Sequence, residues 1–219
     1  MKAKIERIDG LLVAEYGEQI QPPPSEPLAE LIFTILSQTT TRKNYERAYG
    51  QLRARFPAWE EVLSAPTGLV EEAIRSAGLS RVKAFRIQEV LRRILEERGE
   101  LSLSFLHNLN WEEGFQYLVR LPGVGPKTAA CVLLFSCGLP AFPVDTHVHR
   151  LSQRLGLAPK GKTAVEAQAI LQREVPSEIA YRFHVNLVNH GRAICKAQRP
   201  RCQECVLLAQ CRFLEKSSS

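Results

Sequence analysis

Apolar residues recur along this chain at the three-to-four-residue spacing of amphipathic helices, and the alternation typical of strands is nearly absent. The segment from Arg81 to Glu97 illustrates the pattern, because a stripe of small and aliphatic residues opposes Arg and Glu. That stripe is expected to contain Ala84, Ile87, Leu91, Ile94 and Leu95. Further helices are expected over residues 28–36, 44–56, 112–120, 127–137, 146–155, 163–174 and 178–190. The sequence therefore predicts an all-α protein.

Two breaks interrupt the helical pattern. The tract Pro22-Pro23-Pro24 separates an N-terminal helix from the next one, and residues 138–143 form the second break. With 219 residues, of which 45% are hydrophobic, the chain can form one large or two small domains with buried cores. No apolar run approaches the ~20 residues of a membrane span, and the interrupted N-terminal segment is unlike a signal peptide. A cytoplasmic, nucleoid-associated protein is expected.

The stretch Leu-Pro-Gly-Val-Gly-Pro-Lys, residues 121–127, predicts a tight turn that leads into a helix. Gly123 and Gly125 lack Cβ atoms, so the turn can adopt positive φ and bring its amides close to another backbone. Such amides and the helix N-terminus would suit a phosphate. Lys127 falls in the first helical turn, where the helix dipole favours the neutral, nucleophilic amine. An ordinary helix–helix connection with a solvated lysine is the alternative.

A carboxylate follows the turn in Val-Asp-Thr-His, at Asp145. Aspartate before a helix that starts near Thr146 is a good N-cap, and capping is the commoner role of an isolated aspartate. The two roles are compatible, because a capping carboxylate is held rigidly, as a catalytic group must be.

Four of the six cysteines crowd the C-terminal segment with the spacing C-x6-C-x2-C-x5-C, at Cys195, Cys202, Cys205 and Cys211. In a chain without secretory features, such a cluster indicates metal ligation rather than disulfides. The spacing alone is equally compatible with zinc and with an iron–sulfur cluster. Cys131 and Cys137 lie among apolar residues and are expected to be buried.

Together, Leu-Pro-Gly-Val-Gly-Pro-Lys-Thr-Ala, Val-Asp-Thr-His-Val and the cysteine spacing resemble the endonuclease III branch of the helix-hairpin-helix DNA glycosylases. The resemblance extends from Leu28 to Cys211. It implies two helical domains that flank a DNA-binding cleft. Residues 25–139 would form a six-helix barrel with the helix-hairpin-helix at about 114–134. Residues 1–24 and 140–219 would form a cluster domain whose loop, 195–211, holds a [4Fe–4S] cluster through the four cysteines.

The resemblance also implies a reaction. Lys127 would attack the sugar C1′ and form a Schiff base, and Asp145 would accept a proton or stabilise positive charge on the sugar. Relatives that only hydrolyse the glycosidic bond lack a lysine at this position. The resemblance therefore implies a bifunctional glycosylase/AP lyase of base excision repair that removes oxidised pyrimidines and cleaves by β-elimination.

The expected partner is double-stranded DNA with a damaged base or an abasic site. The protein is expected to act as a monomer and not to bind a membrane. A formal net charge of +6 fits a polyanionic partner but is also ordinary for a soluble domain. The expected DNA contacts are Gly123, Val124, Gly125, Lys196, Arg199 and Arg201. The carbonyls of Val119, Leu121 and Val124 are candidate ligands for a monovalent cation beside a phosphate.

The damaged base must leave the duplex to be reached, and wedge side chains would fill the gap. The resemblance suggests Leu79 as one wedge, although this residue could equally be the hydrophobic contact after a glycine-terminated helix. The second would come from Gln38 or Thr39, because gapless comparison puts Thr39 where the family has glutamine. A mismatch-specific adenine glycosylase and a non-catalytic iron–sulfur DNA-binding protein are the competing interpretations, and neither needs the lysine–aspartate pair.

Overall fold

The computed structural model describes residues 1–213, and within them all regular secondary structure is helical. Residues 214–219, the end of the predicted 140–219 segment, lie outside the described residues. The α-helices are α1 Lys2–Tyr16, α2 Pro27–Ser37, α3 Arg42–Arg55, α4 Trp59–Ser64, α5 Thr67–Ala73, α6 Ser80–Arg98, α7 Trp111–Val119, α8 Pro126–Phe135, α9 Thr146–Arg154, α10 Ala164–Glu174 and α11 Ala180–Ala193. Short 3-10 helices are η1 Arg75–Ala77, η2 Ser104–Asn108, η3 Ser177–Ile179, η4 Cys202–Glu204 and η5 Leu208–Gln210. The all-α prediction is confirmed.

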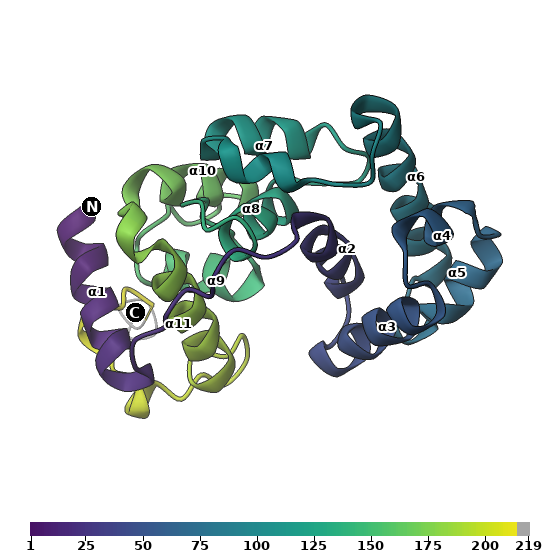
Figure 1. Ribbon diagram of the computed structural model, residues 1–219. Coiled ribbons are helices and arrows are strands. Elements are labelled where there is room, and N and C mark those ends of the chain that lie inside the picture. The colour runs from purple at the N-terminus through teal and green to yellow at the C-terminus, as the bar shows by residue number, and fades with distance from the viewer. Residues whose placement is uncertain (214–219) are drawn as a thin grey trace. The chain divides into compact units, whose positions relative to one another are not determined.

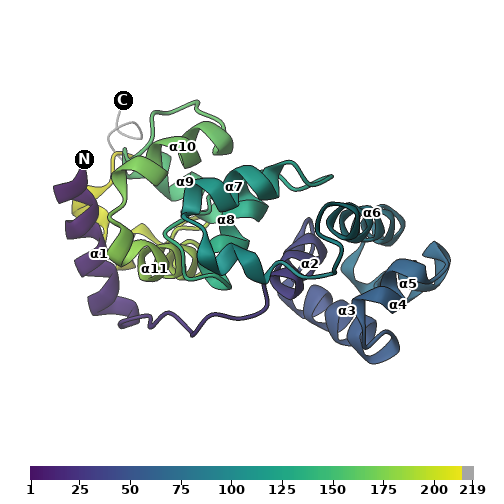
Figure 2. The same ribbon diagram turned by 45° about the horizontal axis from the view of Figure 1, so that its top comes forward.

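The chain folds as two compact units. One is Pro23–Leu139 and contains α2 to α8; the other combines Met1–Pro22 with the described residues from Pro140 onward. In the first unit, α2 packs against both α8 and α3, while α4 and α5 pack on α6 (Figures 1 and 2). Its core is aliphatic, with fully buried residues such as Leu31, Ile35, Ile87 and Leu133.

Helix α6 follows the predicted stripe with one exception. Ala84, Ile87, Leu91 and Ile94 are fully buried, but Leu95 is 38% exposed. Leu95 follows Leu91 by four residues and so lies on about the same side of the helix, but it falls in the last turn of α6, where its side chain is left partly uncovered. The inclusion of Leu95 in the core stripe was therefore wrong.

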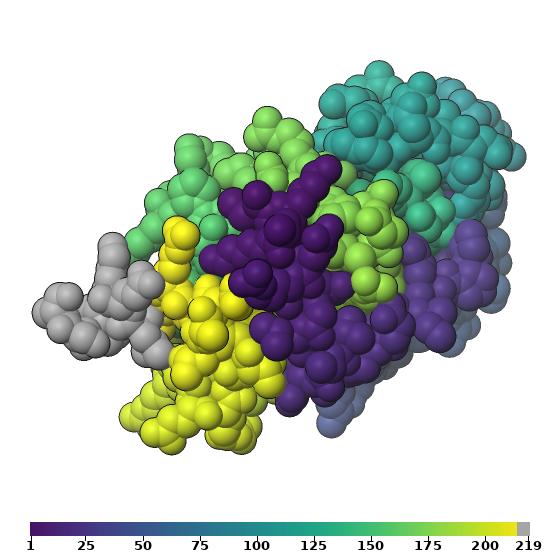
Figure 3. All heavy atoms as spheres, turned by 90° about the vertical axis from the view of Figure 1, so that its left-hand side faces the viewer, coloured from purple at the N-terminus to yellow at the C-terminus, as the bar shows by residue number. Residues whose placement is uncertain are grey.

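In the second unit, α1 lies along α11 (Figure 1). Arg182 of α11 joins them, because it pairs with the buried carboxylate of Asp9 at 2.9 Å and with Glu18 at 2.9 Å. Tyr16 Oη also lies 2.9 Å from His190 Nδ1. The surface view shows α1, in dark purple, directly beside the yellow C-terminal segment (Figure 3).

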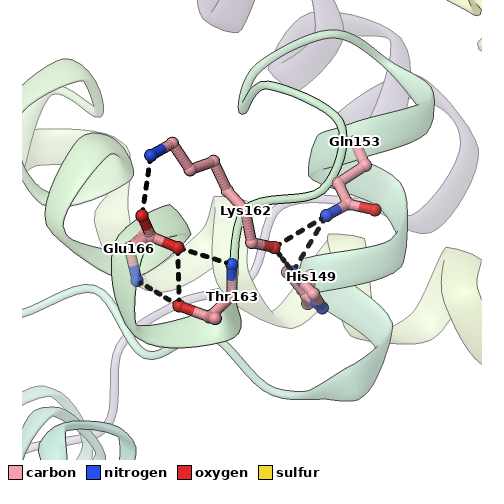
Figure 4. Close-up of polar contacts among 5 residues, drawn as sticks. All are labelled: His149, Gln153, Lys162, Thr163 and Glu166. Carbon is pink, nitrogen blue, oxygen red and sulfur yellow. Dashed lines mark hydrogen bonds and ion pairs between the residues drawn. The ribbon is translucent and has the colours of Figure 1, made fainter.

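The loop between α9 and α10 is fixed by a small polar network (Figure 4). Thr163 and Glu166 form a capping box at the start of α10, and Lys162 donates to Glu166 at 2.7 Å. The Lys162 carbonyl accepts from Gln153 of α9 at 2.9 Å. This network holds α9 against the start of α10. Within residues 1–213, no helix is long and apolar enough to cross a membrane.

Candidate active site and DNA-binding surface

The turn between α7 and α8 has the geometry that its glycines predict. Gly123 has φ +71, and the Val124 amide donates to the Leu121 carbonyl at 3.1 Å. Leu121 and Val124 are buried and anchor the turn, whereas Gly123 and Gly125 are exposed. Gly125 is the N-cap of α8, and Pro126 opens the helix. The two exposed glycines of this turn can therefore approach an external anion with their amides.

Lys127 lies in the first turn of α8, as predicted, and is half-buried. A carboxylate that interacts electrostatically with Lys127, that of Glu30 in α2, lies in the same unit. Burial raises the pKa of Glu30, while the hydrogen bond from Thr34 at 3.0 Å and the charge of Lys127 lower it. Sequence reasoning missed Glu30, because nothing in its local pattern distinguishes it from a helix-surface glutamate.

Asp145 lies in the other unit, at the N-cap of α9. Its Oδ1 accepts hydrogen bonds from the amides of His147 at 2.9 Å and Val148 at 2.8 Å. The structure thus places Lys127 and Asp145 each at the N-terminus of a helix, on different units.

The helix that carries Asp145 is packed closely on α11. A Cβ added to Gly191 would lie 2.8 Å from His147 Cβ, so only glycine permits this approach. Arg150 donates to the carbonyls of Gly191 and Cys195, both at 2.8 Å. Arg150 was missed because its partners are more than 40 residues away. The close approach at Gly191 and the side-chain hydrogen bonds of Arg150 together hold α9 against the C-terminal part of α11.

The cysteine loop is also tied to α9. Arg154 donates to Cys195 Sγ at 3.1 Å and to the Lys196 carbonyl at 2.9 Å, and its own carbonyl accepts from the Arg212 amide at 2.8 Å. Burial raises the pKa of Cys205, and the other three cysteines of the loop act in the same direction. The four sulfur atoms therefore lie close enough to interact electrostatically.

No group of three or more His, Cys, Asp or Glu side chains in residues 1–213 is arranged to hold a metal ion. The four cysteines are half-buried rather than enclosed in the core. A [4Fe–4S] cluster would be held by four cysteine thiolates. The donor set and its gathering in one loop fit such a cluster chemically. Cys131 and Cys137 are buried, as expected.

The basic residues of the cysteine loop differ in their surroundings. Lys196 and Arg199 are exposed, and Arg199 has φ +49. Arg201 is also exposed, but it forms an ion pair with Glu204, with Nε 2.7 Å from Oε1. Sequence reasoning treated Arg199 and Arg201 as equivalent and did not anticipate this pair.

The candidate wedge residues lie on two turns of the first unit. Leu79 is 60% exposed and has φ +49, while Thr39 is exposed and has φ +55. Gln38 is half-buried, accepts from Arg86 Nη1 at 2.9 Å and donates to Thr128 at 3.4 Å. Arg86 also covers the hairpin turn, because a Cβ at Gly123 would lie only 2.5 Å from its Cδ.

Comparison with known proteins agrees with these features. Residues 32–177 match the HhH-GPD superfamily of base excision DNA repair proteins. Endonuclease III of Thermotoga maritima is 35% identical over 192 residues, covering 88% of this chain and 85% of that protein. Endonuclease III of Bacillus subtilis is 37% identical over 192 residues, covering 88% and 84%. A DNA glycosylase homologue from Arabidopsis thaliana is 41% identical over 165 residues, which are 75% of this chain but 56% of the plant protein.

Solved structures give the same result. A trapped endonuclease III–DNA covalent intermediate matches with a TM-score of 0.82 at 30% identity, covering 100% of this chain and 99% of that one. A non-covalent endonuclease III–DNA complex matches with a TM-score of 0.83 at 30% identity, covering 100% and 98%. The chain therefore belongs to the HhH-GPD superfamily and is a base excision repair DNA glycosylase of the endonuclease III family.

Proposed function

We propose that this protein removes oxidised pyrimidines from duplex DNA and then cleaves the strand 3′ to the abasic site. The observation that carries the proposal is Lys127, an amine in the first turn of the helix that follows the Gly123–Gly125 hairpin. A hydrolytic glycosylase has no use for an amine nucleophile there, whereas Schiff-base chemistry requires one. The endonuclease III relatives support this assignment.

In the proposed reaction the lone pair of Lys127 Nζ forms a bond to the sugar C1′. The damaged base leaves with the electrons of its glycosidic bond and takes up a proton. The nitrogen then gives up one of its two protons, and the ring oxygen O4′ takes one up as the C1′–O4′ bond breaks, which leaves an iminium that keeps one N–H and acidifies the C2′ proton. Removal of that proton expels the 3′ phosphate with the C3′–O electrons. Asp145 accepts the amine proton or stabilises positive charge on the sugar.

The proposed DNA contacts come from the backbone and from basic side chains. The turn formed by Gly123, Val124 and Gly125 binds one phosphate at the start of α8 through the amides of its two exposed glycines, where the helix dipole adds to their attraction, while the Val124 amide stays bonded to the Leu121 carbonyl. Lys196, Arg199 and Arg201 reach further phosphates. The carbonyls of Val119, Leu121 and Val124 are the proposed monovalent cation ligands, with that of Leu121 already accepting the Val124 amide.

We assign the two wedges to Leu79 and Thr39. Both are exposed at the tips of turns, whereas the amide of Gln38 is engaged by Arg86 and Thr128 within the same unit. Gln38 would then support the turn, and Thr39 would enter the gap left by the extruded base.

We propose that the cysteine loop binds a [4Fe–4S] cluster as part of a cluster domain formed by residues 1–24 and 140–219. Its ligands would be Cys195, Cys202, Cys205 and Cys211. The bound cluster would fix the shape of the basic loop between Cys195 and Cys202, with no step of the repair reaction passing through it. Anaerobically purified protein should contain iron and sulfide, and stoichiometric zinc without iron would contradict this assignment. The site of action would be nucleoid DNA.

The substrate assignment is tested on a panel of duplexes that carry thymine glycol, dihydrouracil, an abasic site or an A·G mismatch. The undamaged duplex is the control. The proposal expects excision of both oxidised pyrimidines and strand cleavage at the abasic site. Activity at the A·G mismatch alone would identify a mismatch-specific adenine glycosylase instead, and binding without any cleavage would identify a non-catalytic protein.

A further inference from the structure

Lys83 is a lysine that the proposed reaction does not use, and it is buried in α6 with 2% of its surface exposed. Its ammonium donates to three backbone carbonyls, those of Leu36 at 2.8 Å, Gln38 at 2.7 Å and Ala77 at 2.9 Å. An ammonium has three protons, so each can serve one carbonyl. No carboxylate in the described part of the chain pairs with it.

The three carbonyls belong to the two turns that carry the proposed wedges. Leu36 and Gln38 lie at the C-terminal end of α2, immediately before Thr39. Ala77 ends η1, two residues before Leu79. Segments separated by about 40 residues of sequence are thus held to one nitrogen atom.

Both wedge residues have strained backbones. Thr39 and Leu79 are two of the three non-glycine residues with positive φ in residues 1–213. Such conformations persist only where surrounding contacts determine them. The hydrogen bonds from Lys83 fix the carbonyl just before Thr39 and the carbonyl two residues before Leu79. Holding the backbone at these two points restricts the φ angles that Thr39 and Leu79 can adopt.

Stability alone gives a poor account of this lysine. Burial, with a smaller contribution from the charge of Arg86, lowers the pKa of Lys83 to about 8. A buried charge without an ionic partner carries a desolvation cost that an apolar side chain of similar volume would avoid. A lowered lysine pKa can also mark a nucleophile. Lys83 is excluded from that role, because it is inaccessible and its protons are held by carbonyls.

We propose that Lys83 is a positioning residue that holds the Thr39 and Leu79 turns in one conformation, so that both wedges enter the duplex together. This inference rests on the proposed function. Because the turns are ordered before DNA binds, base extrusion does not carry the cost of ordering them. Arg86, one turn further along α6, supports the same arrangement through Gln38 and the Gly123 turn.

The test compares two substrates that differ in their need for wedges. An abasic site in duplex DNA, opposite a base, requires extrusion and gap filling, whereas an abasic site in single-stranded DNA requires neither. Lys83→Met should lose about tenfold or more of its cleavage rate on the duplex, because Thr39 and Leu79 must then adopt their strained backbone conformations without the hydrogen bonds from Lys83. Its rate on the single strand should stay within about twofold of the parent.

Gln88→Met is the matched control. Gln88 is also a buried polar residue of α6, and it donates to the carbonyls of Val62 at 2.9 Å and Ala65 at 2.8 Å, which belong to no wedge turn. This variant should change both rates equally. If Lys83→Met fails to fold, Lys83→Gln, which keeps two donors, should show the same selectivity with a smaller loss.

Two failures can be told apart. A parent protein that cleaves neither substrate would refute the proposed function and, with it, this inference. A parent that cleaves both, together with a Lys83→Met variant that loses both equally or neither, would refute the positioning role alone.

Discussion

At Asp145 one side chain combines a structural and a proposed catalytic role. Its Oδ1 caps α9 by accepting from two amides, so the capping role does not require the negative charge. The proposed catalytic role does require it, because a proton acceptor or a charge stabiliser must be anionic. Substitutions can therefore separate the two roles.

We predict that Asp145→Asn lowers turnover by ~10²–10⁴, the usual contribution of acid–base assistance, with little change in unfolding temperature. Asp145→Ala should lower turnover similarly and also cost about 1 kcal/mol of stability, because it removes the cap. Single-turnover kinetics and thermal unfolding check the pair. An Asp145→Asn variant with parental turnover would show that the carboxylate only caps the helix.

Which residues could be predicted from the sequence depended on how local their chemistry is. Lys127, Asp145 and the four cysteines occur in short motifs whose spacing carries the meaning, so they could be singled out. Lys83, Arg86 and Glu30 could not, because they meet partners on distant segments; Lys83 and Leu36 are 47 residues apart. A lysine in an amphipathic helix looks solvent-exposed until its three carbonyl acceptors are known.

At the scale of elements, the long helices from α2 onward were predicted to within a few residues, since burial on one face leaves a periodic trace. Helix α1 was expected as an N-terminal helix without stated bounds. Helices α4 and α5 were not predicted, because six and seven residues are too few to show a period. The pairing of α2 with α8 follows from tertiary packing, which local sequence does not encode. The hairpin before α8 was predictable, because its glycines constrain the backbone directly.

The hairpin glycines give a prediction with an internal control. Gly123→Ala should destabilise the protein by about 1–3 kcal/mol, because φ is +71 and the new Cβ would displace Arg86. Gly125→Ala should leave stability nearly unchanged, since φ is −89 and no atom lies within 4 Å of the new Cβ. Both should weaken DNA binding, the second by obstructing the phosphate. Thermal unfolding and binding titrations check this, and parental binding by Gly125→Ala would place the phosphate elsewhere.

At the scale of the whole molecule, a net charge of +6 is expected to make DNA binding depend on salt concentration. The structure distinguishes the basic residues that should contribute most to this dependence. Arg199→Ala should reduce the salt slope of DNA affinity by about one charge. Arg201→Ala should reduce it less, because Glu204 already neutralises that guanidinium. Affinities measured across a range of salt concentrations check this. Equal slopes for the parent and Arg199→Ala would show that the cysteine loop faces solvent in the complex.

The central claim is that Lys127 forms a covalent bond with the sugar, and borohydride reduction tests it most directly. The parent protein and the surface variant Lys160→Gln should both yield a reduced, covalent protein–DNA adduct on a duplex with an abasic site. Lys127→Gln should yield none and should not cleave the strand, while it still binds through the backbone amides of the hairpin. A trapped adduct of Lys127→Gln at the parental level would contradict the account and place the nucleophile on another residue.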